Sequence, residues 1–347
     1  MLSSLVKAAQ LPAGGGQQFL AVAHNTTPFI TVYPWSASTG FGSKFANPGT
    51  LPAGDAYSTA FTTACDAIAV AHSNTPFVTA YPWSAGGFGT KFANPLTLIS
   101  DFFALSVAFS PSGDALALGH YQSPLASAYA FSGSGFGTKF SNPATLPGGS
   151  GNGVAFNGIG DALSFAHTIT PFISTYPWSS SGFGTRFSNP GTLPAGNCFG
   201  VAFAPANDAI AVAHATTPFV TAYPWSSSGY GTKFSNPATL PTGTGKAAAF
   251  SPAGDALAIG HDATPFISVY PWSSSGFGTK FSDPSTLPAS AGTEVVFSPS
   301  GDAVAVTHAT TPFVTAYPWS SSGFGTKYSN PSTLPGGAGS GVAFGEI

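Results

Sequence analysis

One short unit recurs seven times along the chain, and this recurrence constrains the fold more than any other feature. The seven histidines all fall at one point of the unit, at successive spacings of 48, 48, 47, 47, 47 and 47 residues: His24, His72, His120, His167, His214, His261 and His308. Repeats of this length are supersecondary units that bury their cores against their neighbours. Because the units fill nearly all of the 347 residues, we predict a single domain over residues 1–347.

Within each unit the hydrophobic period is two residues. In the segment 255–261, Leu257 and Ile259 fall on one face, whereas two alanines and a glycine fall on the other. In the segment 266–272, aromatic and β-branched residues alternate in the same way. This alternation is typical of strands. One bulky and one slim face per strand favour sheets stacked face to face.

Turn residues divide the unit into four strands. The first ends at the Ser-Pro-Ser-Gly segment 298–301, the second before a Thr-Pro pair, and the third at Tyr-Pro-Trp. A Ser/Gly loop then leads to the fourth, which we place in Phe-Gly-Thr-Lys-Phe (277–281) and its equivalents. Four strands per unit of 40–50 residues are the signature of a β-propeller blade. We therefore predict an all-β, seven-bladed β-propeller of four-stranded antiparallel blades.

The two ends of the chain predict how the ring closes. The first unit has its histidine, His24, but no first strand before it, whereas the last segment around Val342–Phe344 is a first strand with no unit after it. Pairing of this C-terminal strand with residues 19–23 would complete the N-terminal blade. Such pairing removes two exposed sheet edges at once.

Composition excludes several classes of function. Only 6% of residues are charged and the net charge is −3, which argues against nucleic acid, whose binding depends on phosphate neutralisation. The 43 glycines and 31 prolines argue against helices. Without an apolar run of 18 residues, we expect no membrane insertion. Cys65 and Cys198 fall three units apart, and we expect free thiols.

The repeated polar residues predict structure rather than chemistry. The histidines are too widely spaced for a metal site, so we expect each to bond a nearby backbone or hydroxyl group. The aspartates that follow the first turn, such as Asp255 and Asp302, are expected to stabilise that turn. The sequence shows neither a Ser-His-Asp set nor a phosphate loop, and the differences between units look small. We therefore predict no catalytic residue, no cofactor, no metal and no enzymatic activity.

A repeated Tyr-Pro-Trp motif offers an alternative binding function. If its indoles lie exposed on one rim, they could stack on sugars, and several weak sites would gain by avidity. The simpler alternative is that the indoles cover the outer edge of each blade. The candidate glycan-contact residues are Trp35, Trp83, Trp178, Trp225, Trp272 and Trp319, with Phe131 in the third unit.

One connector breaks the symmetry. Residues 96–106 read Leu-Thr-Leu-Ile-Ser-Asp-Phe-Phe-Ala-Leu-Ser, where other units have Thr-Leu-Pro and small residues. Ile99, Phe102 and Phe103 are therefore candidate contacts for a partner protein, because exposed apolar clusters often mark such contacts. The alternative is a loop that folds inward and fills a gap in an irregular blade.

The blade sequence resembles a known repeat family. Phe-Ser-Pro-Ser-Gly-Asp-Ala-Val-Ala-Val (297–306) and Pro-Phe-Val-Thr-Ala-Tyr (312–317) are similar to a WD40 blade, and all seven units share the pattern. The resemblance is greatest to the near-identical WD40-like repeats of bacteriophage and bacterial open reading frames. Tyr317-Pro318 stands where the Trp-Asp pair would be, so the WD40 hydrogen-bond network is not carried over.

This resemblance implies a function without catalysis. We expect a structural or adhesive component of a bacteriophage virion, made in the host cytoplasm, that contacts capsid or tail proteins. If the protein is not in a virion, we expect it to be cytoplasmic. The alternative is a multivalent lectin that binds host-surface glycan through the Tyr-Pro-Trp aromatics, and a third possibility is an intracellular assembly platform.

Overall fold

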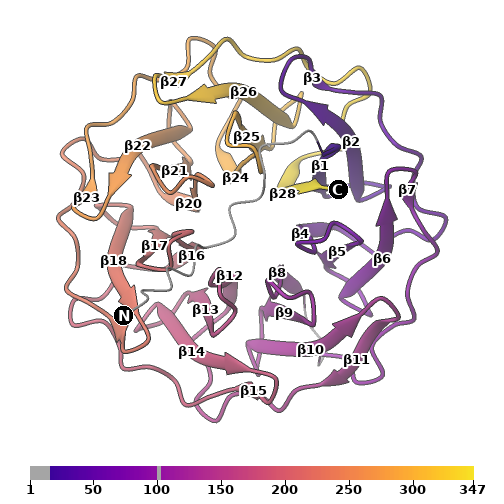
Figure 1. Cartoon of the computed structure of the whole chain (residues 1–347), viewed down its shortest axis with the longest axis horizontal. Helices are drawn as coiled ribbons and strands as arrows, with labels where there is room; N and C mark the ends of the chain where they lie inside the picture. The colour runs from indigo at the N-terminus through magenta and orange to yellow at the C-terminus, as the bar shows by residue number, and fades with distance from the viewer. Residues whose placement is uncertain (1–15, 100–102) are drawn as a thin grey trace, which may run out of the picture.

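The computed structural model of the chain describes residues 16–99 and 103–347, and all the regular elements in these ranges are β-strands. The strands form seven four-stranded antiparallel sheets, which stand as blades around a central axis (Figure 1). We number the blades 1 to 7 along the chain, starting from the sheet that contains β1. The predicted seven-bladed β-propeller is confirmed.

Each blade has an inner pair and an outer pair of strands. The innermost strands, from blade 1 to blade 7, are β28 (Gly339–Glu346), β4 (Ala56–Phe61), β8 (Ala104–Phe109), β12 (Gly151–Phe156), β16 (Cys198–Phe203), β20 (Gly245–Phe250) and β24 (Gly292–Phe297). The second strands are β1 (Gln18–His24), β5 (Ala67–His72), β9 (Ala115–His120), β13 (Ala162–His167), β17 (Ala209–His214), β21 (Ala256–His261) and β25 (Ala303–His308).

The outer pair follows in the same order. The third strands are β2 (Ile30–Ser36), β6 (Val78–Ser84), β10 (Ala126–Ser132), β14 (Ile173–Ser179), β18 (Val220–Ser226), β22 (Ile267–Ser273) and β26 (Val314–Ser320). The fourth strands are β3 (Gly40–Phe41), β7 (Gly87–Phe88), β11 (Gly135–Lys139), β15 (Gly182–Phe183), β19 (Gly229–Tyr230), β23 (Gly276–Phe277) and β27 (Gly323–Phe324). Six of these fourth strands have two residues, so they are shorter than predicted, and only β11 reaches its lysine.

The ring closes through the C-terminal strand. β28 pairs antiparallel with β1, so that Phe344 lies opposite Leu20 and Val342 lies opposite Val22. The ring of Phe344 also packs edge-on against Trp35, with 5.2 Å between the ring centroids. Blade 1 is therefore built from both ends of the described chain, as predicted (Figure 1).

Neighbouring blades pack a slim face against a bulky face. In β17 of blade 5, Ala209, Ala211 and Ala213 contact Leu257 and Ile259 of β21 in blade 6. The same arrangement of alanines against aliphatic residues recurs between blades 6 and 7. Small alanine side chains let the sheets approach closely, and each buried Leu or Ile contributes about 1.5–3 kcal/mol.

Tyrosine and histidine make the recurring polar contacts of the blades. In blade 6 the buried Tyr270 hydroxyl donates to the Thr239 carbonyl oxygen of the preceding connector, at 2.9 Å. All seven blades have this bond, which explains why the Tyr-Pro and Thr-Leu-Pro elements recur together.

His261 is fully buried, and its Nε2 lies 3.0 Å from the Ser268 hydroxyl. The other six histidines make the same contact with a threonine or serine, so the predicted hydroxyl partner is confirmed.

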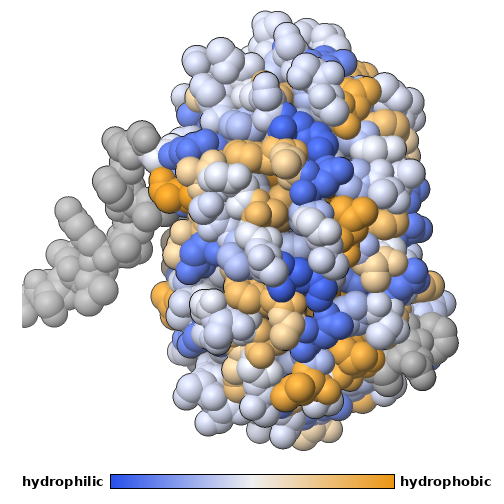
Figure 2. Space-filling view, turned by 90° about the vertical axis from the view of Figure 1, so that its right-hand side faces the viewer, coloured by the Kyte–Doolittle hydropathy of each residue, from blue (hydrophilic) through white to orange (hydrophobic). Residues whose placement is uncertain are grey.

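The outer wall of the propeller is mixed in polarity. Figure 2 shows hydrophilic and hydrophobic residues that alternate across it. The repeated lysines contribute to this wall, and each donates to the asparagine or aspartate of the following Asn/Asp-Pro turn, as Lys327 does to Asn330. Cys65 and Cys198 are buried free thiols, as expected.

Removal of residues 340–347 tests the closure. The deletion takes away most of β28, leaves an edge of β1 unpaired and exposes Trp35. We expect it to reduce the free energy of unfolding by several kcal/mol, as for the loss of several buried side chains, and to lower the thermal midpoint. Deletion of Ile347 alone, which is half exposed, is the control. An unchanged midpoint in the longer deletion would contradict this closure.

The buried histidines predict a strong loss of stability in acid. Desolvation lowers the pKa of six of them, His24, His72, His120, His167, His214 and His308, to about 4, and it lowers that of His261 as well. In the unfolded chain their pKa is about 6.5. Unfolding therefore takes up protons between pH 6.5 and 4, and the stability present above pH 6.5 is lost as pH falls through this window, by up to about 1.4 kcal/mol per pH unit for each histidine.

Urea unfolding at pH 7.5, 6.5, 5.5 and 4.5 measures this loss. We expect the midpoint to be nearly constant from pH 7.5 to 6.5 and to fall steeply below pH 6. Equal midpoints at pH 7.5 and 5 would show that the histidines are not buried in the neutral form.

Candidate functional site

The seven innermost strands differ from one another mainly at one place. Their first residue is always small and their sixth is always phenylalanine. Their second residue is different in every blade, from blade 1 to blade 7: Ser340, Tyr57, Leu105, Asn152, Phe199, Lys246 and Thr293. The units are otherwise nearly identical, so the second residue of the innermost strand is a position at which the blades clearly differ.

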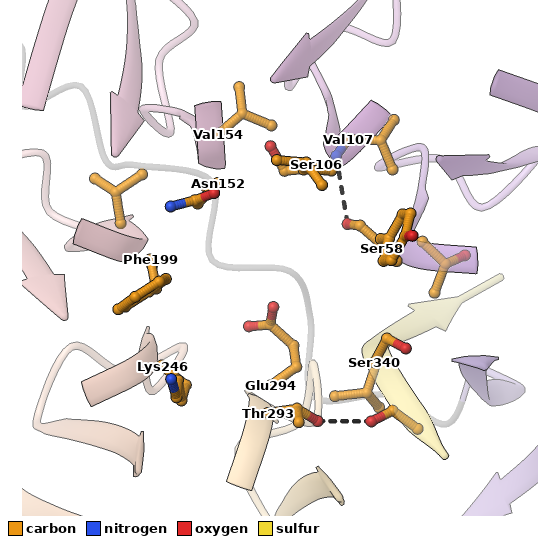
Figure 3. Close-up of a pocket in the computed structure, with 18 of the residues that line it drawn as sticks. Ser58, Ser106, Val107, Asn152, Val154, Phe199, Lys246, Thr293, Glu294 and Ser340 are labelled. Atoms are coloured by element: carbon orange, nitrogen blue, oxygen red, sulfur yellow. Dashed lines mark hydrogen bonds between the residues drawn. The ribbon is translucent and has the colours of Figure 1, made fainter. Parts of the chain in front are cut away.

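A β-bulge puts these variable residues where they can meet. In every blade the pairing of the innermost strand with the second strand skips the second residue. A bulged residue leaves the ladder and its side chain is re-aimed. The seven residues line a cavity of about 540 Å³ on the central axis (Figure 3). The structure thus brings together residues that are far apart in the sequence.

Hydrogen bonds between blades hold part of this lining. Asn152 Nδ2 of blade 4 donates to the Cys198 carbonyl oxygen of blade 5 at 2.9 Å. Thr293 Oγ1 donates to the Gly339 carbonyl oxygen at 2.7 Å, and Ser58 Oγ accepts from the Val107 backbone N–H at 3.3 Å (Figure 3). These bonds fix the spacing between neighbouring innermost strands at the channel.

Two charged side chains lie in the channel on adjacent blades. Glu294, the third residue of β24, points its carboxyl group into the channel, and Lys246 lies on β20 of the neighbouring blade (Figure 3). The Lys246 ammonium is 4.5 Å from the centre of the Phe199 ring, a cation–π contact. Neither charge has a charged counterpart at the same position of the other blades.

The channel wall changes the acid–base behaviour of Glu294, although the residue is only partly buried. Desolvation raises the pKa of its carboxyl group to about 8, against a smaller lowering by the Val295 backbone amide. A carboxyl group with a pKa near the working pH can both accept and donate a proton. The Lys246 ammonium in the same channel can stabilise developing negative charge, so the channel can support general acid–base chemistry on a carbonyl compound.

The sequence analysis missed this site because it looked for chemistry in the repeated residues. The differences between units were judged small, yet the second residue of the innermost strand, which lines the channel, differs in every blade, and the third residue is Glu294 in blade 7 alone. A column-by-column comparison of the seven units would have shown the position, although not that the seven residues share one cavity. Among the described residues, no three His, Cys, Asp or Glu side chains are grouped as metal ligands.

The structure contradicts the glycan-contact role predicted for Trp35, Trp83, Trp178, Trp225, Trp272 and Trp319. Their side chains are only 4–7% exposed. Trp272, for example, packs edge-on against Phe234, Phe250 and Phe277, with centroid distances of 5.1–5.3 Å. An indole surrounded in this way has no free face on which a sugar could stack. Phe131 takes the same place in blade 3.

The candidate partner contacts in the irregular connector differ in how far they are exposed to solvent. Ile99 is 3% exposed and packs in the core between blades 2 and 3, so it cannot contact a partner, and the inward-folding alternative is right for this residue. Phe103 is 37% exposed. Phe102 lies outside the described residues. Leu96 and Leu98 of the same connector are also exposed, Leu96 completely.

Comparison with known proteins gives structural likeness only. No family model matches the sequence, and no curated protein matches it either. Solved structures do match, with low sequence identity. A protein from Bacteroides fragilis, named provisionally as a 6-phosphogluconolactonase, has a TM-score of 0.76 and 10% identity over 96% of this chain and 99% of its own.

Two further structures are similar to the same extent. The periplasmic gluconolactonase PpgL of Pseudomonas aeruginosa has a TM-score of 0.72 and 14% identity over 95% of this chain and 99% of its own. A protein from Lactobacillus plantarum has a TM-score of 0.74 and 13% identity over 95% of this chain and all of its own. At these identities the likeness shows the fold alone.

These structures correct one prediction and leave another without support. The expectation that the chain is not an enzyme is contradicted, because propellers of this fold are named as lactonases. That expectation took near-identical blades as evidence against a single reactive site, whereas the blades differ at the axis. The virion component predicted from the repeat type has no support in these matches.

The buried indoles make a testable prediction about stability. We expect Trp272→Ala to reduce the free energy of unfolding by about 3–5 kcal/mol, because it leaves a cavity among three aromatic rings. Trp272→Phe is the matched control and should cost less, since blade 3 already uses Phe131 there. Urea unfolding measures both variants. A Trp272→Ala variant as stable as the native protein would contradict this packing.

Proposed function

We propose that the protein binds a small organic molecule in its central channel and hydrolyses a lactone there. The observation that supports this proposal is that the bulged residue of the innermost strand differs in all seven blades and faces the channel, where the chain also places Glu294 and Lys246. A site for a single small molecule requires a cavity whose walls differ from one side to the other. The seven different bulged residues give the channel such walls within a ring of nearly identical blades. The cavity of about 540 Å³ has the size of typical ligand sites. The named lactonases of the same fold suggest the reaction class.

Hydrolysis assigns a role to each of the two charged groups. The Glu294 carboxylate accepts a proton from water as the water oxygen bonds to the lactone carbonyl carbon. The Lys246 ammonium stabilises the negative charge that develops on the carbonyl oxygen. The ring C–O bond then breaks, and the proton held by Glu294 passes to the departing alkoxide. The product is the open hydroxy acid.

Contacts with another protein stay a prediction. The fully exposed Leu96 and the exposed Leu98 favour such a contact at the connector between blades 2 and 3. The capsid or tail proteins that the repeat type suggests as partners stay predictions, and so does the virion location. Binding of host-surface glycan stays a prediction only for a surface other than the buried indoles. Within the described ranges, no helix is long and apolar enough to cross a membrane.

A pH profile of lactone hydrolysis tests the proposal. We expect the purified protein to open glucono-1,5-lactone faster than the spontaneous reaction measured in parallel, and the enzymatic rate to rise with pH and level off above about pH 8, as Glu294 becomes ionised. Glu294→Gln should lower the rate about 10²-fold or more, the usual contribution of a general base.

The variant is expected to fold, since glutamine has no buried charge to desolvate. The control is Asp283→Asn, which changes an acidic residue whose partner is Lys280 in the outer wall. Equal rates for Glu294→Gln and the native protein would contradict the role of Glu294. A rate no higher than the spontaneous one for gluconolactone and for every other lactone tested would overturn the proposed reaction.

A further inference from the structure

The wall of the channel differs from one side to the other. Blades 6, 7 and 1 contribute Lys246, Glu294 and Ser340, whereas the bulged residues of blades 2 and 3 are Tyr57 and Leu105. Figure 3 shows Ser58, Ser106 and Val107 across the opening from Lys246. A molecule that fills this cavity therefore meets both charged groups on one side, and on the other it meets Tyr57 and Leu105 together with two uncharged serines.

From Tyr57, a row of aromatic rings continues beyond the residues that line the channel. The ring of Tyr57 lies 5.9 Å from that of Phe103, which lies 6.3 Å from that of Tyr121. The Tyr121 backbone N–H donates to the Phe103 carbonyl oxygen at 3.1 Å, so the two residues are held side by side. Phe103 is 37% exposed and Tyr121 52% exposed. We call Tyr57, Phe103 and Tyr121 the aromatic row.

Blade 3 differs from the other blades at the positions of Phe103 and Tyr121. Where blade 3 has Phe103, the other blades have Asp55, Ser150, Asn197, Thr244, Ala291 and Ala338. Where blade 3 has Tyr121, the others have Asn25, Ser73, Thr168, Ala215, Asp262 and Ala309. Exposed aromatics at the mouth of the channel are thus a second departure from symmetry, joined to the first through Tyr57.

The charge of the channel argues against a phosphorylated substrate. Among the described residues that line the cavity, Lys246 is the one cation, and Glu294 lies on the next blade. Phosphate groups are usually held by arginines that bond two oxygens at once. The single arginine of the chain, Arg186, donates instead to the Ser174 hydroxyl. A phosphate dianion would meet too little positive charge here.

We infer that the substrate class of this channel is an uncharged lactone with an apolar tail. The inference rests on the proposed function. The lactone carbonyl lies between Lys246 and Glu294, and the tail runs over Leu105 and Tyr57 and leaves the channel across Phe103 and Tyr121. Burial of each methylene of the tail raises kcat/KM about fourfold, until the tail passes Tyr121.

A series of γ-lactones with linear alkyl tails of one to nine carbons tests the inference. We expect kcat/KM to rise with tail length, and to be higher for the long tails than for gluconolactone or its 6-phosphate. The double variant Phe103→Ser/Tyr121→Ser should raise KM at least tenfold for the longest tails and leave the shortest lactone unchanged. Ile159→Ser removes an apolar side chain that is more exposed than either ring, from a turn of blade 4, and is the control.

Binding of the same lactones, measured by calorimetry on the Glu294→Gln protein, separates the two proposals. Tail-dependent affinity that the double variant loses supports the inference, even if no lactone is hydrolysed and the proposed reaction fails. Hydrolysis of gluconolactone with no effect of tail length overturns the inference and leaves the proposed function standing. A preference for the 6-phosphate also overturns it, as does the absence of lactone binding.

Discussion

The contact between the alanine face of one blade and the aliphatic face of the next is the constraint on which the structure depends. Ala209, Ala211 and Ala213 fit against Leu257 and Ile259 because a methyl group leaves room for a longer side chain. Repeating one such contact around the axis sets the angle between blades. Seven such contacts close a ring only if the last blade packs against the first. The pairing of β28 with β1 completes the first blade and so allows this closure.

A frame of this kind leaves little of each blade free to vary. The tyrosine must reach a connector carbonyl, the histidine must reach a hydroxyl, and the tryptophan must fill a space among three rings. These requirements are the same in every blade, except that Phe131 takes the place of the tryptophan in blade 3. The bulged second residue of the innermost strand is different, because it faces the axis rather than another sheet. Variation is therefore tolerated there, and Lys246, Phe199 and Tyr57 occupy equivalent positions.

Much of the fold followed from the sequence, and the errors are instructive. The two-residue period, the turn residues and the spacing of the histidines predicted strands, blades and closure correctly. Trp272 was a candidate surface aromatic because it follows Tyr-Pro at the end of a strand. It is buried because Phe234, which comes from the preceding blade, lies against it. Ile99 was a candidate contact for a similar reason, and the structure buries it between two blades.

The sequence by itself determined what is local and repeated: four strands in each unit, seven units, and a terminal strand to complete the first. These features are encoded in periodicity and turn chemistry, which act over a few residues. Only the tertiary structure decided that Glu294 and Lys246 share a cavity with Tyr57 and Asn152. Residues a full repeat or more apart in the chain meet because the closed ring brings every innermost strand to the same axis, and that convergence is a property of the assembled blades rather than of any one of them.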